Sequence, residues 1–205
     1  MTPTATPAHP PPPAARRMTV DEYWEFCQRP ENHNRLTELV RGEVIDVSRG
    51  NLLHGRLCSR VSYLLEAYAE TAGNGYPAGN DTGVVLDEQA GTVVGPDVAY
   101  YLDEAETTAD IAAKWGDRVP VLVVEVLSPS DRPGRVNAKV ADYLAGGVAA
   151  VWVVDPDEAT VTVYLPRHNL TVVPQTGSVT GPAVLPGLLV QVADIFRIPG
   201  RGRPQ

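Results

Sequence analysis

The clearest pattern in the chain is an apolar run with one carboxylate inside it, VPVLVVEVLSPS from Val119 to Ser130. Seven of the eight residues from Pro120 to Leu127 fit a buried strand, and the eighth is Glu125. A second apolar run, AAVWVVDP, covers residues 149–156. Because the two runs flank a helical pattern at 135–148, we expect them to be central, parallel strands of one sheet.

Helical periodicity predicts two long helices and one short one. Residues 51–70 have apolar residues at helical spacing on one face, namely Leu53, Leu57, Val61, Leu64, Leu65 and Tyr68. Residues 135–148 have an inward stripe of Val136, Val140, Tyr143 and Leu144 and end at Gly146-Gly147. Thr19, followed three residues later by Glu22, is a capping box, so a short helix should cover residues 20–28.

The remaining patterned segments predict strands. LTELVRGEVIDVS at 36–48 indicates a hairpin that turns at Arg41-Gly42. Further strands are expected near 82–86, 96–102 and 160–166, with NLTVVPQ at 169–175 as a partner for the last. A helix or loop is expected at 103–114, and a strand or turn followed by a short helix at 185–196. The order of elements predicts an α/β or α+β fold with a mixed sheet flanked by helices.

The chain of 205 residues suits one folded domain, expected at 18–198. Residues 1–17 form a leader rich in proline and alanine, and 199–205 form a tail; we expect both to be disordered. Apolar runs fall short of the roughly 20 residues that span a bilayer, and no signal peptide is evident, which favours a cytoplasmic protein without membrane contact. Cys27 and Cys58 match no zinc spacing and are expected to be reduced thiols.

Glu125 raises a chemical question, because moving an unpaired carboxylate out of water costs several kcal/mol. It could lie at an exposed strand end, pair with an interior cation, or bind a metal ion. Asp97, in VVGPDVAYYL, precedes another apolar strand, although Pro-Asp alone is an ordinary turn signal. If the two strands are neighbours, both carboxylates can converge with a backbone carbonyl on one Mg²⁺ ion.

Other polar residues border the expected core. Lys139 lies at the edge of the helical stripe and could send its ammonium inward or into solvent. Glu38 and Glu43 both alternate with apolar residues of the hairpin, and alternation does not choose between them. His54, on the apolar face of the helix at 51–70, could contact a phosphate or water, or could be a satisfied core histidine.

The chain resembles a known family in a series of segments. In order, these are TELVRGEVIDVS, the helix with His54, GPDVAYY, VVEVLSPS, the lysine-bearing helix, GGVAAVWVVDPDEATVTVY and LPGLLVQVADIF. They are similar to the Uma-two family of restriction-endonuclease-like proteins in the PD-(D/E)xK nuclease superfamily, over about residues 18–196. The resemblance implies a restriction-endonuclease-like core with its site at one edge of the sheet. It also implies metal-dependent cleavage of DNA, with Mg²⁺ as the cofactor and Mn²⁺ as a substitute.

The resemblance further assigns roles to individual residues. Asp97 and Glu125 would hold the metal, and the carbonyl of Val126 would join them. The superfamily usually has lysine two residues after the glutamate, where this chain has Leu127, and a lysine of the following helix, Lys139, would substitute. Glu38 matches the early glutamate, with Glu43 in reserve.

The net charge of −8 does not by itself indicate a nucleic-acid substrate, because nucleic-acid binders usually have a basic face. Arg132 and Arg135 could touch phosphates, or could lie in a solvated loop. A homodimer would bring two sites to one duplex. The alternatives are a non-catalytic binding or assembly protein on the same fold and a metal-dependent hydrolase of small phosphate compounds.

Overall fold

The computed structural model describes residues 16–79, 82–102, 107, 109, 111, 115, 118–167 and 169–198. Nearly all of the leader expected at 1–17, the tail at 199–205 and most of 103–114 lie outside these residues. The described helices are α1 (Val20–Gln28), the 3-10 turn η1 (Pro30–Asn32), α2 (Leu52–Ala72), α3 (Pro133–Ala145) and α4 (Val192–Phe196). The described strands are β1 (Thr37–Val40), β2 (Glu43–Asp46), β3 (Tyr76–Gly79), β4 (Val84–Asp87), β5 (Thr92–Val94), β6 (Val98–Tyr101), β7 (Leu122–Val126), β8 (Ala150–Asp155), β9 (Thr160–Leu165), β10 (Asn169–Pro174), β11 (Ser178–Thr180) and β12 (Leu189–Gln191).

Local sequence signals explain where the helices begin and end. At the start of α1, the Thr19 hydroxyl accepts the Glu22 N–H and the Glu22 carboxylate accepts the Thr19 N–H, so the predicted capping box is confirmed. The Asn51 side chain caps α2 by accepting the N–H of His54. The same helix ends at Gly73, whose φ of 70° is the left-handed conformation that glycine adopts most easily.

The main sheet has six strands in the order β10-β9-β8-β7-β6-β3. β7 and β8 are parallel, with α3 as the connection between them, and the predicted central parallel pair is confirmed. The other neighbours in this sheet are antiparallel, including β9 with β10, the predicted partner of β9. The sheet is therefore mixed, as the sequence predicts.

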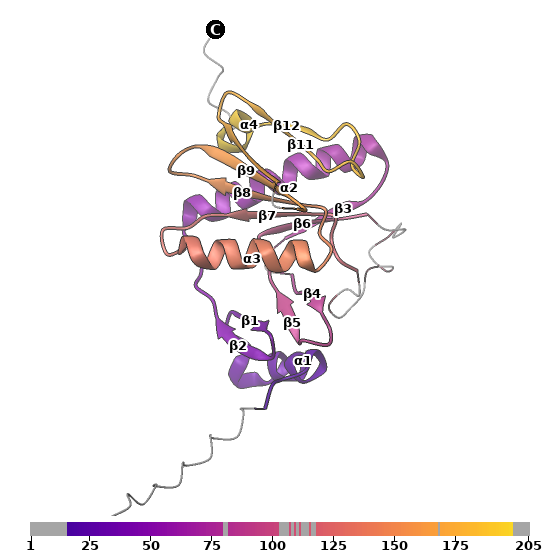
Figure 1. Ribbon diagram of the computed structural model, residues 1–205, viewed down its shortest axis with the longest axis vertical. Helices are drawn as coiled ribbons and strands as arrows, with labels where there is room; N and C mark the ends of the chain where they lie inside the picture. The colour runs from indigo at the N-terminus through magenta and orange to yellow at the C-terminus, as the bar shows by residue number, and fades with distance from the viewer. Residues whose placement is uncertain are drawn as a thin grey trace, which may run out of the picture.

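One long helix covers each face of this sheet (Figure 1). On one face, Leu57, Val61 and Leu65 of α2 share a buried cluster with Val124 and Trp152. On the other, α3 packs into a second cluster; its members include Val123, Val140, Tyr143 and Val151. The alternation of residues in β7 between the two clusters means that Glu125 faces α3.

Leu53 shares a helical face with Leu57, as the spacing predicts, but the residue is 51% exposed. The preceding Leu52 is 91% exposed, so the first turn of α2 extends past the packed part of its interface with the sheet. Helical spacing fixes the face of a side chain but not whether a sheet lies beneath it.

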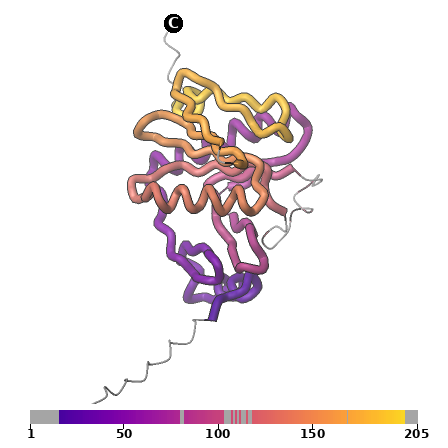
Figure 2. Tube along the Cα trace, viewed as in Figure 1, coloured from indigo at the N-terminus to yellow at the C-terminus, as the bar shows by residue number. Residues whose placement is uncertain are grey.

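A smaller four-stranded sheet, in the order β2-β1-β5-β4, lies on the α3 side of the main sheet (Figures 1 and 2). α1 packs on it through a cluster that includes Val20, Tyr23, Leu39 and Val93. The predicted hairpin at 36–48 forms β1 and β2, with Arg41 and Gly42 at its turn. This sheet brings β1 close to the corner of the main sheet where β6 begins. Within the described residues, no helix combines the length and apolar character needed to cross a membrane.

Candidate active site

Asp97 and Glu125 are brought together by the pairing of β6 with β7. These strands are antiparallel, with Val98 opposite Val124. Continuing the register by one residue in each direction (98 − 1 and 124 + 1) sets Asp97 opposite Glu125, and opposite residues of antiparallel strands share a face. The N–H of Val126 donates a 2.7 Å hydrogen bond to Asp97 Oδ2, which fixes this carboxylate at the end of β7. Two acidic groups that are 28 positions apart in the sequence therefore lie at one corner of the sheet.

Lys139 reaches this corner from α3. Its Nζ lies 2.9 Å from Glu125 Oε1 and 3.1 Å from Glu38 Oε1, and it donates a 3.4 Å hydrogen bond to the carbonyl of Gly95. Only 24% of the side chain is exposed. Of the two orientations left open by the sequence, the structure has the inward one, because two carboxylates from different sheets meet at the ammonium.

Glu38, and not Glu43, faces the site. Glu38 is 6% exposed and accepts a 3.1 Å hydrogen bond from the N–H of Gly95, whereas Glu43 is exposed. The pairing of β1 with β5 places this buried glutamate beside the turn that leads into β6. Glu38 therefore holds one side of the Lys139 ammonium while Glu125 holds the other.

Burial dominates the electrostatics of Glu125. It raises the pKa of this carboxyl to about 7, against the opposing effect of Lys139. The hydroxyl of the fully buried Tyr143 donates to Glu125 Oε1, and burial raises the pKa of that phenol well above its usual value. Burial alone would lower the pKa of Lys139, but the charges of Glu125 and Glu38 outweigh it and raise the pKa. Lys139 thus stays an ammonium.

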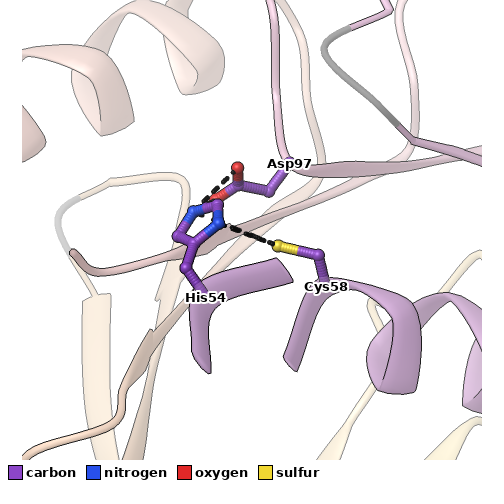
Figure 3. Close-up of side chains that lie close together, drawn as sticks. All are labelled: His54, Cys58 and Asp97. Carbon is purple, nitrogen blue, oxygen red and sulfur yellow. Dashed lines mark hydrogen bonds and ion pairs between the residues drawn. The ribbon is translucent and has the colours of Figure 1, made fainter. Parts of the chain in front are cut away.

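His54 and Cys58 approach Asp97 from α2, where they lie one helical turn apart (Figure 3). His54 Nε2 is 3.1 Å from Asp97 Oδ1 and 3.2 Å from Oδ2. Cys58 Sγ is 3.5 Å from His54 Nδ1. The hydrogen bond to Asp97 raises the pKa of His54 to about 10, so the imidazole is a cation paired with Asp97 at neutral pH.

Apart from Tyr143, which is buried behind Glu125, the side chains described above line one cavity of about 1220 Å³. Its wall includes Glu38, His54, Cys58, Asp97, Glu125 and Lys139, together with Arg135 from the first turn of α3. Small-molecule pockets usually occupy roughly 300–1,000 Å³, so this cavity is large for a drug-sized ligand.

The match to a family model covers residues 20–193 of this chain. That model describes the family Uma2, "Putative restriction endonuclease". This chain belongs to the Uma2 family. The resemblance expected from the sequence, to the same family under the name Uma-two, is confirmed.

One solved structure similar to this Uma2 protein is from Anabaena variabilis ATCC 29413 and is described as "a putative nuclease belonging to DUF820". The match has a TM-score of 0.72 and 22% sequence identity, and it covers 87% of this chain and 97% of the other. At that identity the likeness establishes the fold, and it confirms the expected fold class. A comparison with curated proteins gives no match.

The other residues predicted from the sequence occupy different positions around the Uma2 cavity. Val126 and Arg135 line it, whereas Arg132, at the N-cap of α3, is exposed and is not among its lining residues. Leu127 follows β7 where the superfamily usually has lysine, and the ammonium of Lys139 lies beside Glu125 instead.

The acidic groups fit a hard divalent ion. In the described part of the chain, the contacts of Glu125 with Tyr143 and Lys139 both use Oε1, which leaves Oε2 for a further ligand. Among the described residues, Asp97 Oδ2 accepts the N–H of Val126 and lies near His54 Nε2, while the hydrogen-bonding partner of Oδ1 is the same imidazole. Carboxylate and carbonyl oxygens are the donors that Mg²⁺ prefers.

Two residues of the site were missed by the sequence analysis. Tyr143 was placed in the core stripe, but its hydroxyl has a specific partner in Glu125. Cys58 was treated as an ordinary thiol, although it lies four residues after His54, a spacing that puts both on one helical face. That spacing was the available signal for Cys58, whereas Tyr143 had none beyond its aromatic position.

Proposed function

We propose that this protein is a metal-dependent endonuclease that hydrolyses phosphodiester bonds of DNA. The observation that carries the proposal is the position of Lys139. Its ammonium is held between Glu38 and Glu125, in the same cavity wall as Asp97. A cation next to a pair of carboxylates at a sheet corner is an arrangement that can bind a divalent ion and a phosphate together.

Asp97, Glu125 and the carbonyl of Val126 would hold the ion, which is Mg²⁺ or, as a substitute, Mn²⁺. When bound, such an ion polarises a phosphoryl oxygen and lowers the pKa of a coordinated water. The protein keeps Asp97 oriented by the N–H of Val126, and Tyr143 holds Glu125 through Oε1. These bonds leave the carboxylates pre-oriented before an ion arrives.

Lys139 acts on the nucleophile and on the developing charge. Its three donors face Glu125, Glu38 and the Gly95 carbonyl, and the bond to Gly95 is the longest at 3.4 Å. Exchanging that bond would let Nζ donate to a water beside Glu125 and stabilise negative charge on the phosphate. Glu38 keeps the ammonium in place from the opposite side. Because the lysine is held by two carboxylates, its pKa stays high and it serves as an electrostatic group and not as a base.

The cavity favours a polymeric substrate over a small phosphate compound. At about 1220 Å³ it exceeds the usual range for small ligands, of roughly 300–1,000 Å³. Arg135 and the His54 imidazolium line it and can contact phosphates on either side of the cleaved bond. We propose Arg132 as a more distant phosphate contact at the start of α3, and a homodimer as the form that acts on a duplex.

The two alternatives have less support. A non-catalytic protein on this fold would have no need to bury a lysine between two carboxylates, since leaving it in solvent costs less. A hydrolase of small phosphate compounds would favour a smaller cavity. The convergence of Asp97, Glu125 and Lys139 counts against the non-catalytic alternative, and the size of the cavity counts against the hydrolase of small compounds.

Plasmid cleavage tests the proposal. The purified chain is incubated with supercoiled plasmid and Mg²⁺ or Mn²⁺, next to Asp97→Asn, Glu125→Gln and a Glu43→Gln control, which changes an exposed glutamate of the same type. We expect the cleavage rate of the first two variants to fall by more than about 100-fold. Substitution of residues that only support a metal ligand already lowers metal affinity or activity by about 10–100-fold, and these two residues would bind the ion directly. The control should cut at the wild-type rate. Cleavage that survives in both site variants, or without a divalent ion, would overturn the proposal.

A further inference from the structure

A second set of potential metal ligands lies at the edge of the cavity, and its chemistry differs from that of the carboxylate pair. His54, Cys58 and Asp97 each offer a ligand atom, and these three atoms all lie within 4.8 Å of one another (Figure 3). The set combines a nitrogen, a sulfur and an oxygen. Thiolate and imidazole are ligands that Zn²⁺ accepts readily, whereas Mg²⁺ does not favour sulfur.

The distances are close to those of a tetrahedral zinc site. With Zn–S near 2.3 Å and Zn–N or Zn–O near 2.0–2.2 Å, neighbouring ligand atoms should lie about 3.4–3.7 Å apart. His54 Nε2 is 4.0 Å from Cys58 Sγ and 3.1 Å from Asp97 Oδ1. Small rotations of the imidazole and the thiol would bring both separations into that range.

The three side chains are held in place by their own surroundings. Asn51 caps the helix at the N–H of His54, which fixes the first turn of α2. Gly50 leaves room for the imidazole, since a Cβ there would lie 2.3 Å from Nδ1. The side chains of His54 and Asp97 are only 16% and 12% exposed. A site of this kind is preorganised on rigid elements, with one coordination position left for a water.

We propose that His54, Cys58 and Asp97 form a binding site for a thiophilic divalent ion such as Zn²⁺, which shares Asp97 with the hard-ion site at Asp97 and Glu125. Binding takes up the thiolate of Cys58 and the neutral imidazole of His54, so the proton of each group passes to solvent. Because Asp97 belongs to both ligand sets, an ion held here withdraws it from the other set. Zn²⁺ would therefore inhibit the Mg²⁺-dependent cleavage; this consequence rests on the proposed function, whereas the binding site does not.

Cobalt binding tests the site without any assay of activity. Co²⁺ substitutes for zinc, and a cobalt–thiolate bond gives a charge-transfer absorption in the near ultraviolet that oxygen ligands do not produce. The full-length chain is titrated with Co²⁺ at mildly alkaline pH in the absence of Mg²⁺, so that no other ion competes for Asp97, and the band reports only Co²⁺ bound through a thiolate. We expect the band to saturate at one ion per chain and to disappear when Zn²⁺ is added.

Two cysteine variants assign the band. Cys58→Ser should remove it, and Cys27→Ser, which changes the other free thiol, should leave it intact. His54→Asn should weaken the binding by more than about 10-fold while the thiol remains, which guards against misfolding of the cysteine variant. Absence of the band in the wild-type chain, or its persistence in Cys58→Ser, would overturn the site.

Inhibition is measured separately. The quantity compared in the plasmid assay is the Zn²⁺ concentration that halves the cleavage rate. It should be at least about 10-fold lower for the wild type than for Cys58→Ser, a variant that retains both proposed carboxylate ligands. Equal inhibition of both proteins would contradict competition through Asp97. A chain that binds Co²⁺ through Cys58 but never cuts DNA would refute the proposed function and leave the metal site standing.

Discussion

A carboxylate among the valines of β7 needs a compensating partner, and Glu125 has two. Lys139 provides the charge and Tyr143 a hydroxyl, both at Oε1. Because burial of an unpaired charge is costly, the sequence left three possibilities for this carboxylate: an exposed strand end, an interior cation or a metal ion. The sequence does not show which of these partners Glu125 has, because the partner depends on the side chains that the fold brings to β7.

At the same scale, His54 provides a prediction about pH. Its pKa is raised from 6.5 to about 10 in the folded chain by its bond to Asp97. The folded state therefore binds more protons than the unfolded state between these values, and the stabilisation falls as pH rises. It should be complete below about pH 6.5 and lost as pH passes 10.

The measurement is the melting temperature of the metal-free chain in a chelator, for wild type and His54→Gln. The glutamine keeps a hydrogen-bonding group of similar length but does not titrate. The melting temperature of the wild type should exceed that of His54→Gln most in the acidic range, and this difference should shrink toward pH 10. A difference that stays constant or grows with pH contradicts a paired imidazolium.

Element patterns predicted much of the fold and less of the site. The hairpin, the long helices and the parallel pair were predictable because each has a strong period or a continuous apolar run. β3, β5 and β11 were not. β3 contains a proline and a glycine, and β5 and β11 are three residues long, so they form because neighbouring strands pair with them. Helical periodicity predicted that Lys139 lies at the edge of the apolar face of α3. It did not predict that the side chain points inward, because that orientation depends on the ion pair with Glu38, which belongs to the other sheet.

The start of α3 gives a matched pair of arginines. Arg135 lines the cavity and Arg132, one helical turn earlier, does not. Arg135→Gln should weaken DNA binding several-fold and reduce the dependence of affinity on salt, because one phosphate contact is lost. Arg132→Gln should have the smaller effect. Affinities measured by fluorescence anisotropy at two salt concentrations test this, and a larger loss for Arg132→Gln would contradict the placement.

At the scale of the whole molecule, charge limits how DNA can bind. The chain has a net charge of −8, and the cavity wall contains Glu38, Asp97 and Glu125. Lys139 and the His54 imidazolium are paired with these carboxylates and offset part of their charge, so the corner around Asp97 and Glu125 stays acidic and repels phosphate until a divalent ion binds. We therefore expect Ca²⁺, which occupies oxygen sites, to raise the affinity for DNA at least about 10-fold over the metal-free chain, as expected for about 1.4 kcal/mol of electrostatic relief.

Anisotropy titrations of a labelled duplex, in Ca²⁺ and in chelator at equal ionic strength, measure that difference. Glu125→Gln serves as the comparison, because it removes one of the repelling charges and one of the ligands together. Its affinity should depend less on Ca²⁺ than that of the wild type. Equal wild-type affinity with and without the ion would mean that DNA binds elsewhere on the molecule.

Ion binding by the acidic pair is the claim on which the rest depends, and calorimetric titration with Mn²⁺ tests it most directly. Cys58→Ser serves as the parent in this titration, so that thiolate binding cannot contribute. We expect this parent to bind Mn²⁺ in a saturable manner, and Asp97→Asn and Glu125→Gln made in it to lose that binding, while Glu43→Gln retains it. Saturable binding that is unchanged by both site substitutions, or no binding by the parent, would contradict the account.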